Sequence, residues 1–253
     1  MKRTLSEVWA AFQFLTRLPV PSSCYSPDVL ARAGKFFPLV GLVIGLIGAL
    51  LHKLLANALP PSINALVVLT YLVFITGGFH EDALADAADG FGGGWNRESV
   101  LEIMRDSRIG SYGGIAIALS LLWRYTLLTR LPGDRFTSYF VAAHVLCRWT
   151  ALPLSYALPA ARVNGAGVAM AQRTSAMGLA VGSIITVAVC AGWLRSAAWL
   201  PIFATLVIVV LSGWYYWRRL RGVTGDCFGA TNQLSEIAVY LCGCVAGSSA
   251  HYH

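Results

Sequence analysis

The sequence predicts an all-α, polytopic transmembrane helical bundle of about six or seven spans, formed by residues 1–253 as one integral-membrane catalytic domain. Of these 253 residues, 57% are hydrophobic and 12% are charged, and the mean hydropathy is +0.63. A soluble domain carries about 25% charged residues. A membrane span needs about 20 apolar residues, and six or seven such stretches are present. The composition therefore excludes a cytosolic globular domain, a disordered chain and a secreted disulfide scaffold.

The elements follow in chain order. Residues 8–15 predict a short amphipathic helix on the membrane surface, within a polar arm of residues 1–36. Spans are expected at residues 37–59, 63–76, 115–131, 139–158, 177–194, 198–217 and 237–247. Gly41, Gly45 and Gly48 recur at near-helical spacing in the first span, which allows close approach of a neighbouring helix. The two long polar stretches between spans are residues 77–114 and 218–234.

The basic residues predict the orientation in the membrane. If the N-terminus is cytoplasmic, 13 of the 19 Lys and Arg fall in segments on that side. The positive-inside rule then places both polar stretches, and the active site, on the cytoplasmic side of the cell inner membrane. The only basic cluster is Arg218, Arg219 and Arg221, so no nucleic-acid partner is expected despite the net charge of +7.

The acidic residues are concentrated in the first polar stretch, where seven of the 12 lie between residues 81 and 106. Asp82, Asp86 and Asp89 are spaced i, i+4, i+7, which places them on one helix face. No Lys or Arg lies between residues 54 and 96 to offset their repulsion. Carboxylate oxygens suit Mg²⁺, Mn²⁺ or Ca²⁺. A solvated acidic face is the alternative, but the helix is otherwise apolar, which favours a metal site.

A second helix is predicted to begin after Asn96 and to run to about Ser107. Glu102 and Asp106 lie at i, i+4 on it. With the glycines at 90–94 reversing the chain, this hairpin would join five carboxylates to the guanidiniums of Arg105 and Arg108. Carboxylates that hold divalent ions, with arginine nearby, are the groups that phosphoryl transfer requires.

Residues 222–232 form a second polar island, around Asp226. An ordinary turn explains Asp226 as well as a functional role does, because turns favour Gly and Asp. His80 precedes the acidic face and is suited to acid–base work, although a hydrogen bond at the helix start explains it equally. The six cysteines contain no Cys-x-x-Cys pair, so we expect them to pack as apolar residues.

Several of these motifs together resemble the cobalamin synthase family, the adenosylcobinamide-GDP ribazoletransferases. The resemblance rests on Gly77-Gly78-Phe79-His80-Glu81-Asp82-Ala83-Leu84-Ala85-Asp86-Ala87-Ala88-Asp89-Gly90 and on Met104-Arg105-Asp106-Ser107-Arg108-Ile109-Gly110. Residues 14–21, 224–226 and 229–230 also match its pattern, so that residues 12–236 are covered. Ala83 stands where the family pattern leads us to expect Gly.

The resemblance implies an inner-membrane transferase of cobalamin biosynthesis. It would join adenosylcobinamide-GDP to α-ribazole, or to α-ribazole 5′-phosphate, and release GMP, with Mg²⁺ as the expected ion and Mn²⁺ as a substitute. On this basis the expected catalytic residues are Asp82, Asp226 and His80. The expected substrate-binding residues are Arg97, Arg105, Arg108, Thr224 and Asn232, and the expected metal ligands are Asp82, Asp86, Asp89, Glu102 and Asp106. The expected partners are the corrinoid-GDP and α-ribazole substrates and the lipid bilayer; a homo-oligomer stays open.

Two alternatives remain from the residues alone. Asp86 to Gly90 looks like the opening of the CDP-alcohol phosphotransferase signature, and a phospholipid synthase of that type would share the metal chemistry. The Ala-Arg that should follow is absent, which leaves an analogy of mechanism. A cation transporter would also hold carboxylates near a membrane, but at mid-span rather than at one edge.

Overall fold

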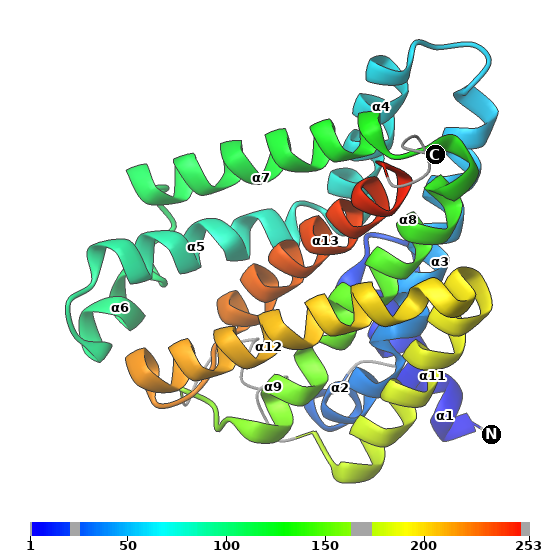
Figure 1. Cartoon of the computed structure of the whole chain (residues 1–253). Helices are drawn as coiled ribbons and strands as arrows, with labels where there is room; N and C mark the ends of the chain where they lie inside the picture. Colours follow the sequence, from blue (N-terminus) through cyan, green and yellow to red (C-terminus); the bar gives the residue numbers. More distant parts are fainter. Residues whose placement is uncertain (1, 21–25, 163–173, 249–253) are drawn as a thin grey trace.

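The computed structural model describes residues 2–20, 26–162 and 174–248, and these residues form an assembly of helices (Figure 1). Within the described ranges the only β-type pairing is an isolated parallel bridge between Ala160 and Val223. The prediction of an all-α fold is therefore confirmed. The helices are α1 (Lys2–Leu15), α2 (Pro27–Ala33), η2 (Gly34–Phe36), α3 (Phe37–Leu55), α4 (Pro61–Thr76), α5 (Phe79–Gly93), α6 (Arg97–Ile103), α7 (Ser111–Arg130), α8 (Gly133–Trp149), α9 (Ala151–Ala157), α11 (Ala176–Leu194), η3 (Arg195–Ala198), α12 (Trp199–Leu220) and α13 (Gly225–Ser248).

The N-terminal arm contains a longer helix than the sequence predicted, because α1 begins at Lys2 rather than near Val8. Its Glu7 is buried and forms two ion pairs: Oε1 lies 3.0 Å from Nε of Arg32, and Oε2 lies 2.8 Å from Nζ of Lys35. These two contacts hold α1 against the segment α2–η2 that leads into α3.

Helices occupy all seven ranges in which spans were expected, namely α3, α4, α7, α8, α11, α12 and α13. Two continuous helical stretches of the described chain, Asp28–Leu55 and Ala176–Leu220, are long and apolar enough to cross a membrane. A third span results if α4 and α5, which meet at 84°, count as one broken span. α8 has only 17 residues and carries Arg148, while α7 contains Arg124. By length and composition the structure thus supports two or three spans, and six or seven remains a prediction.

The glycines of α3 do allow close packing, as their spacing predicted. A β-carbon on Gly45 would lie 3.0 Å from the Cα of Val141, and one on Gly48 would lie 2.6 Å from Cε1 of Phe140. A β-carbon on Gly41 would collide with the carbonyl of His144. All three contacts are with α8, so the backbones of α3 and α8 approach too closely for larger residues.

The position of α5 follows from a sharp bend. Gly77 and Gly78 both have positive φ, +67° and +71°, a conformation that glycine adopts without steric cost. The amide of Gly77 ends α4 by bonding to the carbonyl of Phe74 at 3.1 Å. α5 then runs beside α7 and α13 (Figure 1). A β-carbon on Gly229 of α13 would collide with the methyl of Ala83, so the two helices touch at this point.

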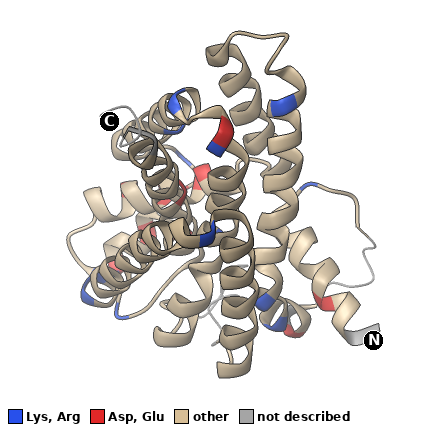
Figure 2. Cartoon of the chain, turned by 45° about the vertical axis from the view of Figure 1, so that its right-hand side comes forward, with Lys and Arg blue, Asp and Glu red and all other residues tan. Residues whose placement is uncertain are grey.

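Charged residues are sparse along the helices, and most turns carry neither an acidic nor a basic residue (Figure 2). Large apolar side chains are exposed on α7, α11 and α12, among them Trp123, Ile184 and Phe203. Extensive exposed apolar surface of this kind marks a membrane or protein interface. The fold and composition together are those of a membrane protein.

Candidate active site

The acidic stripe of α5, which we define as Asp82, Asp86 and Asp89, lies on one face of a regular helix as the spacing predicted. Its three members differ in environment, because Asp82 is exposed, Asp86 is half-buried and Asp89 is buried. The stripe therefore runs from the surface toward the junction of α5 with α7.

Asp89 holds α7 in place. Its Oδ2 accepts a bond of 2.7 Å from the amide of Gly110, and its Oδ1 accepts one of 2.9 Å from the amide of Gly113. These amides lie at the N-terminus of α7, where a negative charge is stabilised by unpaired N–H groups and the helix dipole. Each oxygen of Asp89 thus already has a structural partner, and its predicted role as a metal ligand is neither supported nor contradicted.

Asp226 lies in the first turn of α13, where it meets the acidic stripe. Thr224 precedes the helix, and its hydroxyl accepts a bond from the amide of Cys227 at 3.3 Å, as an N-cap does. The same hydroxyl donates to Oδ2 of Asp226 at 3.2 Å. Thr224 is buried, and it therefore orients Asp226 from inside the protein.

The carboxylates of this site influence one another's ionisation. α5 and the first turn of α13 lie outside the predicted spans. Burial, and then the charges of Asp82 and Asp226, raise the pKa of Asp86 to about 7. Burial also raises the pKa of Asp226, against the opposing effects of Arg162 and Thr224. Burial and like charges both disfavour a charged carboxylate. The cluster of Asp82, Asp86 and Asp226 is consequently short of positive charge and suited to a bound cation.

The basic residue at this cluster is Arg162, which the sequence analysis counted only for topology. Its Nη1 lies 3.4 Å from Oδ2 of Asp226, and its Nη2 donates to the carbonyl of Leu101 at 3.3 Å. No local motif surrounds Arg162 in the sequence. Its role depends on the pairing of segments that lie about 60 residues apart, which periodicity does not reveal.

The second half of the predicted hairpin is shorter than expected. Asn96 caps α6 as predicted, accepting from the amide of Ser99 at 2.8 Å, but α6 ends at Ile103 and not near Ser107. Asp106 instead accepts from the amide of Arg108 at 3.0 Å, a turn geometry that competes with the helix. Glu102 and Asp106 therefore do not share a helix.

The charged groups of this segment face outward. Glu102 and Arg105 are exposed, and the exposed Arg108 donates to Asp106, with Nη2 to Oδ2 at 2.6 Å. Arg97 donates to two backbone carbonyls, those of Leu220 at 2.8 Å and Ala161 at 2.7 Å. The expected meeting of five carboxylates with Arg105 and Arg108 is replaced by the three-aspartate cluster with Arg162. The assigned ligand and substrate roles of the outward residues stay predictions.

His80 and Asn232 lie inside the bundle. His80 is 6% exposed, and neither ring nitrogen has a hydrogen-bond partner among the residues that the structure describes. Asn232 is 4% exposed, and its Oδ1 lacks such a partner too. Because successive helix positions are 100° apart, His80 and Asp82 point to opposite sides of α5. The predicted acid–base role of His80 remains open, and the structure gives it no contact with the carboxylates.

A buried ionic network lies beneath the site, and the sequence analysis did not predict it. Arg124 of α7 is 1% exposed; its Nη2 lies 2.8 Å from Oε1 of Glu81, and its Nη1 lies 3.7 Å from Oε1 of Glu236. Gln233 also donates to Glu81 at 3.1 Å and accepts from Ser120 at 2.9 Å. The signal was present, because an arginine within an apolar span needs an acidic partner inside the protein.

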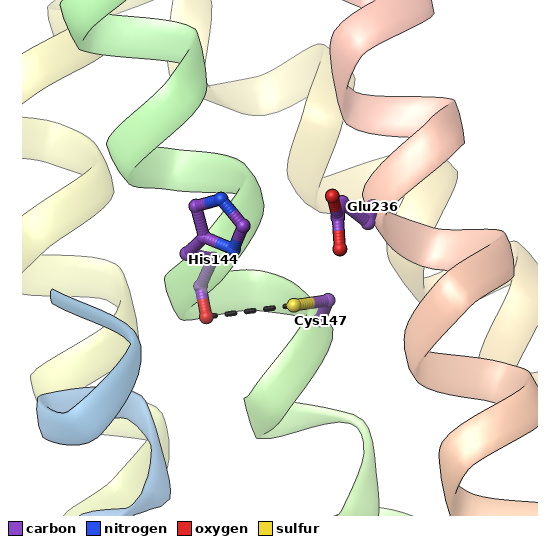
Figure 3. Close-up of side chains that lie close together, drawn as sticks. All are labelled: His144, Cys147 and Glu236. Carbon is purple, nitrogen blue, oxygen red and sulfur yellow. Dashed lines mark hydrogen bonds between the residues drawn. The ribbon is translucent and has the colours of Figure 1, made fainter. Parts of the chain in front are cut away.

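His, Cys, Asp and Glu side chains that lie close together elsewhere in the described residues could also hold a metal. One group of three, His144, Cys147 and Glu236, has potential ligand atoms that all lie within 4.8 Å of one another (Figure 3). The guanidinium of Arg148, however, lies against two of these three side chains. Its Nη1 lies 3.2 Å from Nδ1 of His144 and 3.5 Å from the sulfur of Cys147. An arginine can only donate, so Nδ1 is the acceptor and Nε2 donates to the hydroxyl of Tyr240 at 3.1 Å. We therefore assign this group to packing and hydrogen bonding rather than to a metal.

Comparison with known proteins shows the same family over nearly the whole chain. Residues 7–245 match the family described as Cobalamin-5-phosphate synthase. The chain is 40% identical to the adenosylcobinamide-GDP ribazoletransferase of Shewanella frigidimarina, over 94% of each chain. It is 36% identical to the protein of the same name from Ralstonia nicotianae, over 94% of this chain and 95% of the relative. The relative from Vibrio cholerae is 38% identical, over 91% of this chain and 90% of its own. No solved structure matches.

Proposed function

The chain belongs to the cobalamin-5-phosphate synthase family, and we propose that it carries out the adenosylcobinamide-GDP ribazoletransferase reaction at the cluster of Asp82, Asp86 and Asp226. The reaction joins adenosylcobinamide-GDP to α-ribazole or its 5′-phosphate and releases GMP. One observation carries the location of the site. Although 140 residues separate Asp226 from Asp86, α13 packs against α5, so that the first turn of α13 brings the charge of Asp226 to bear on Asp86. A turn aspartate without a role has no reason to add its charge to an acidic stripe.

Mg²⁺, with Mn²⁺ as a substitute, is the ion we propose for this cluster. The donors are carboxylate oxygens, the ligands that these hard ions prefer. In the described part of the chain the aspartate oxygens do not all lie within 4.8 Å of one another. Such an open set suits Mg²⁺, which commonly keeps water and shares a substrate phosphate. When bound, the ion would neutralise charge on the phosphates and lower the pKa of the attacking hydroxyl.

Asp226 is the residue we propose to take the proton. A ribose hydroxyl of the ribazole attacks the phosphorus bonded to the cobinamide arm, a new P–O bond forms, and the bond to the GMP oxygen breaks. Thr224 holds Asp226 by its hydroxyl, and the raised pKa of Asp226 makes its carboxylate a better proton acceptor. Asp82, which is exposed, is placed to meet substrate from the solvent side.

The remaining predicted site residues fall into two groups. Arg105 and Arg108 are exposed and free to reach a diphosphate, although Arg108 must then leave Asp106. Arg97 acts indirectly, because its hydrogen bonds to the carbonyls of Leu220 and Ala161 hold the backbone beside the cluster. His80 and Asn232 are buried, so we propose that they shape the interior behind the cluster.

The protein is proposed to span the inner membrane several times, with the cluster on the cytoplasmic side. Basic residues support this orientation by the positive-inside rule. Within the described chain they include Arg97, Arg105, Arg108, Arg162, Arg218, Arg219 and Arg221; Arg173, counted with them in the sequence, lies outside the described residues. The α4–α5 bend would let α5 lie along the membrane face rather than cross it.

GMP release from adenosylcobinamide-GDP, measured with and without α-ribazole, tests the proposed function. We expect release only when both substrates are present, full loss on chelation and recovery with Mg²⁺. Asp86→Asn should lower kcat by a factor on the order of 10³, or about 4 kcal/mol. Release of CMP from a CDP-alcohol donor without GMP release from adenosylcobinamide-GDP, or Asp86→Asn turnover near the wild-type value with unchanged Mg²⁺ demand, would refute it.

A further inference from the structure

Arg162 is held beside the cluster by backbone pairing. The amide of Ala161 donates to the carbonyl of Val223 at 2.9 Å, and the amide of Val223 donates to the carbonyl of Pro159 at 2.9 Å. Arg97 clamps both sides of this bridge through the carbonyls of Ala161 and Leu220. Because Val223 lies three residues before Asp226, the pairing fixes the residue after Ala161 next to Asp226.

The guanidinium of Arg162 is only partly engaged in this position. Among the described residues it has one ion pair, with Asp226, and one hydrogen bond, to the carbonyl of Leu101, and its buried Nε has no partner there. Its side chain is 16% exposed, so it lies at the mouth of the site rather than in the core. A side chain with unused donors and access to solvent can change partners at low cost.

The charges at the cluster determine which partners Arg162 would exchange. Among the described basic residues, Arg162 is the one that forms an ion pair with Asp226, and its charge also opposes the rise in the pKa of Asp86. A divalent ion held by Asp82 and Asp86 would compete with this guanidinium, because two cations close to one acidic cluster repel each other. A substrate diphosphate, in contrast, offers the planar oxygen pair that the arginine fork binds through two parallel hydrogen bonds.

We propose that Arg162 is a built-in counter-ion of the metal site: it pairs with Asp226 in the absence of a divalent ion, and it binds the diphosphate of the GDP-bearing substrate once the ion has bound at the cluster. This inference rests on the proposed function, because it needs a cation at the cluster. It assigns to one residue two opposite effects, weaker binding of the free ion and stronger binding of the substrate.

The test measures Mn²⁺ binding directly, from the EPR signal of free Mn²⁺ in titrations of the detergent-purified enzyme without substrate. Arg162→Gln should lower the Mn²⁺ Kd by about threefold, the scale of a partly exposed ion pair. It should also raise the KM for adenosylcobinamide-GDP by about tenfold. Arg162→Lys keeps the charge and should leave the Mn²⁺ Kd near the wild-type value, yet still raise KM because the fork is lost. Arg218→Gln removes an exposed charge from the last turn of α12 and should change neither value.

The outcomes are distinct. An unchanged or higher Mn²⁺ Kd in Arg162→Gln, or an unchanged KM in both Arg162 variants, overturns the counter-ion inference while leaving the metal site intact. If the wild-type protein binds Mn²⁺ no better than Asp86→Asn, the metal site of the proposed function fails, and the inference fails with it. Should Arg162→Gln not fold, the KM of Arg162→Lys decides, because it keeps the ion pair and loses only the fork.

Discussion

Replacing Arg124 by Met tests the buried network that anchors α5 to its neighbours. Arg124 is 1% exposed and forms an ion pair of 2.8 Å with Glu81 and a longer one of 3.7 Å with Glu236. Methionine fills much of the same volume without the charge. Two carboxylates then remain in the interior, and in the described part of the chain Gln233 is the one other donor of a hydrogen bond to Glu81.

The expected loss of unfolding free energy is about 3–5 kcal/mol, the usual cost of removing one partner from a buried ion pair. The cost arises from the carboxylates left without a counter-ion rather than from the lost attraction itself. If that is correct, Arg124→Met combined with Glu81→Gln should recover a large part of the loss, because one of the stranded charges disappears. Arg130→Met, at the exposed end of the same helix, is the matched control and should change stability by less than about 0.5 kcal/mol.

Unfolding by SDS, followed through tryptophan fluorescence in detergent micelles, measures all three variants. A loss below about 1 kcal/mol for Arg124→Met would mean that the network is not desolvated as the exposures indicate. A double variant that is no more stable than the single one would mean that the cost comes from packing and not from charge.

Three further predictions concern the site and its setting. Asp226→Asn should fold normally, because Asn keeps the hydrogen bond to Thr224, but its kcat should fall at least roughly 100-fold. The control is Asp134→Asn in the first turn of α8, where Asp134 is 76% exposed, and this variant should have nearly wild-type kcat. Equal, mild effects of the two substitutions would return Asp226 to a turn role. Gly229→Ala should lower the free energy of unfolding, measured in SDS, by about 1–3 kcal/mol, because the added methyl collides with Ala83. Ala83→Gly in the same chain should restore the stability, and failure of this rescue would place the strain elsewhere. A single cysteine at Glu98, in a Cys-free background, should resist impermeant thiol reagents added from the periplasm, and labelling from that side would reverse the proposed topology.

The Ala83 substitution in the family motif has a structural explanation. The sequence alone showed only that a methyl group stands where Gly was expected. The structure places that methyl against Gly229, which has no β-carbon. The extra volume on α5 is therefore accommodated by the absence of a side chain on α13.

The candidate site was only partly predictable for a physical reason. Asp82, Asp86 and Asp89 were identified because helical periodicity is local and places residues i, i+4 and i+7 together. The role of Asp226 was evenly balanced, because a glycine-rich turn and a functional loop have the same composition. Glu102 and Asp106 were expected on one helix, but the hydrogen bond from the amide of Arg108 to Asp106 ends that helix early.

The sequence by itself determined the all-α class, the position of each long helix, the acidic stripe and the family, since each depends on composition, periodicity or a contiguous motif. Only the tertiary structure decided which face of one helix meets which face of another. The pairing of residues 159–161 with Val223 brings Arg162 to Asp226, and the packing of α5, α7 and α13 brings Arg124 to Glu81. Such contacts depend on side-chain volume and burial across segments distant in sequence, and no local pattern encodes them.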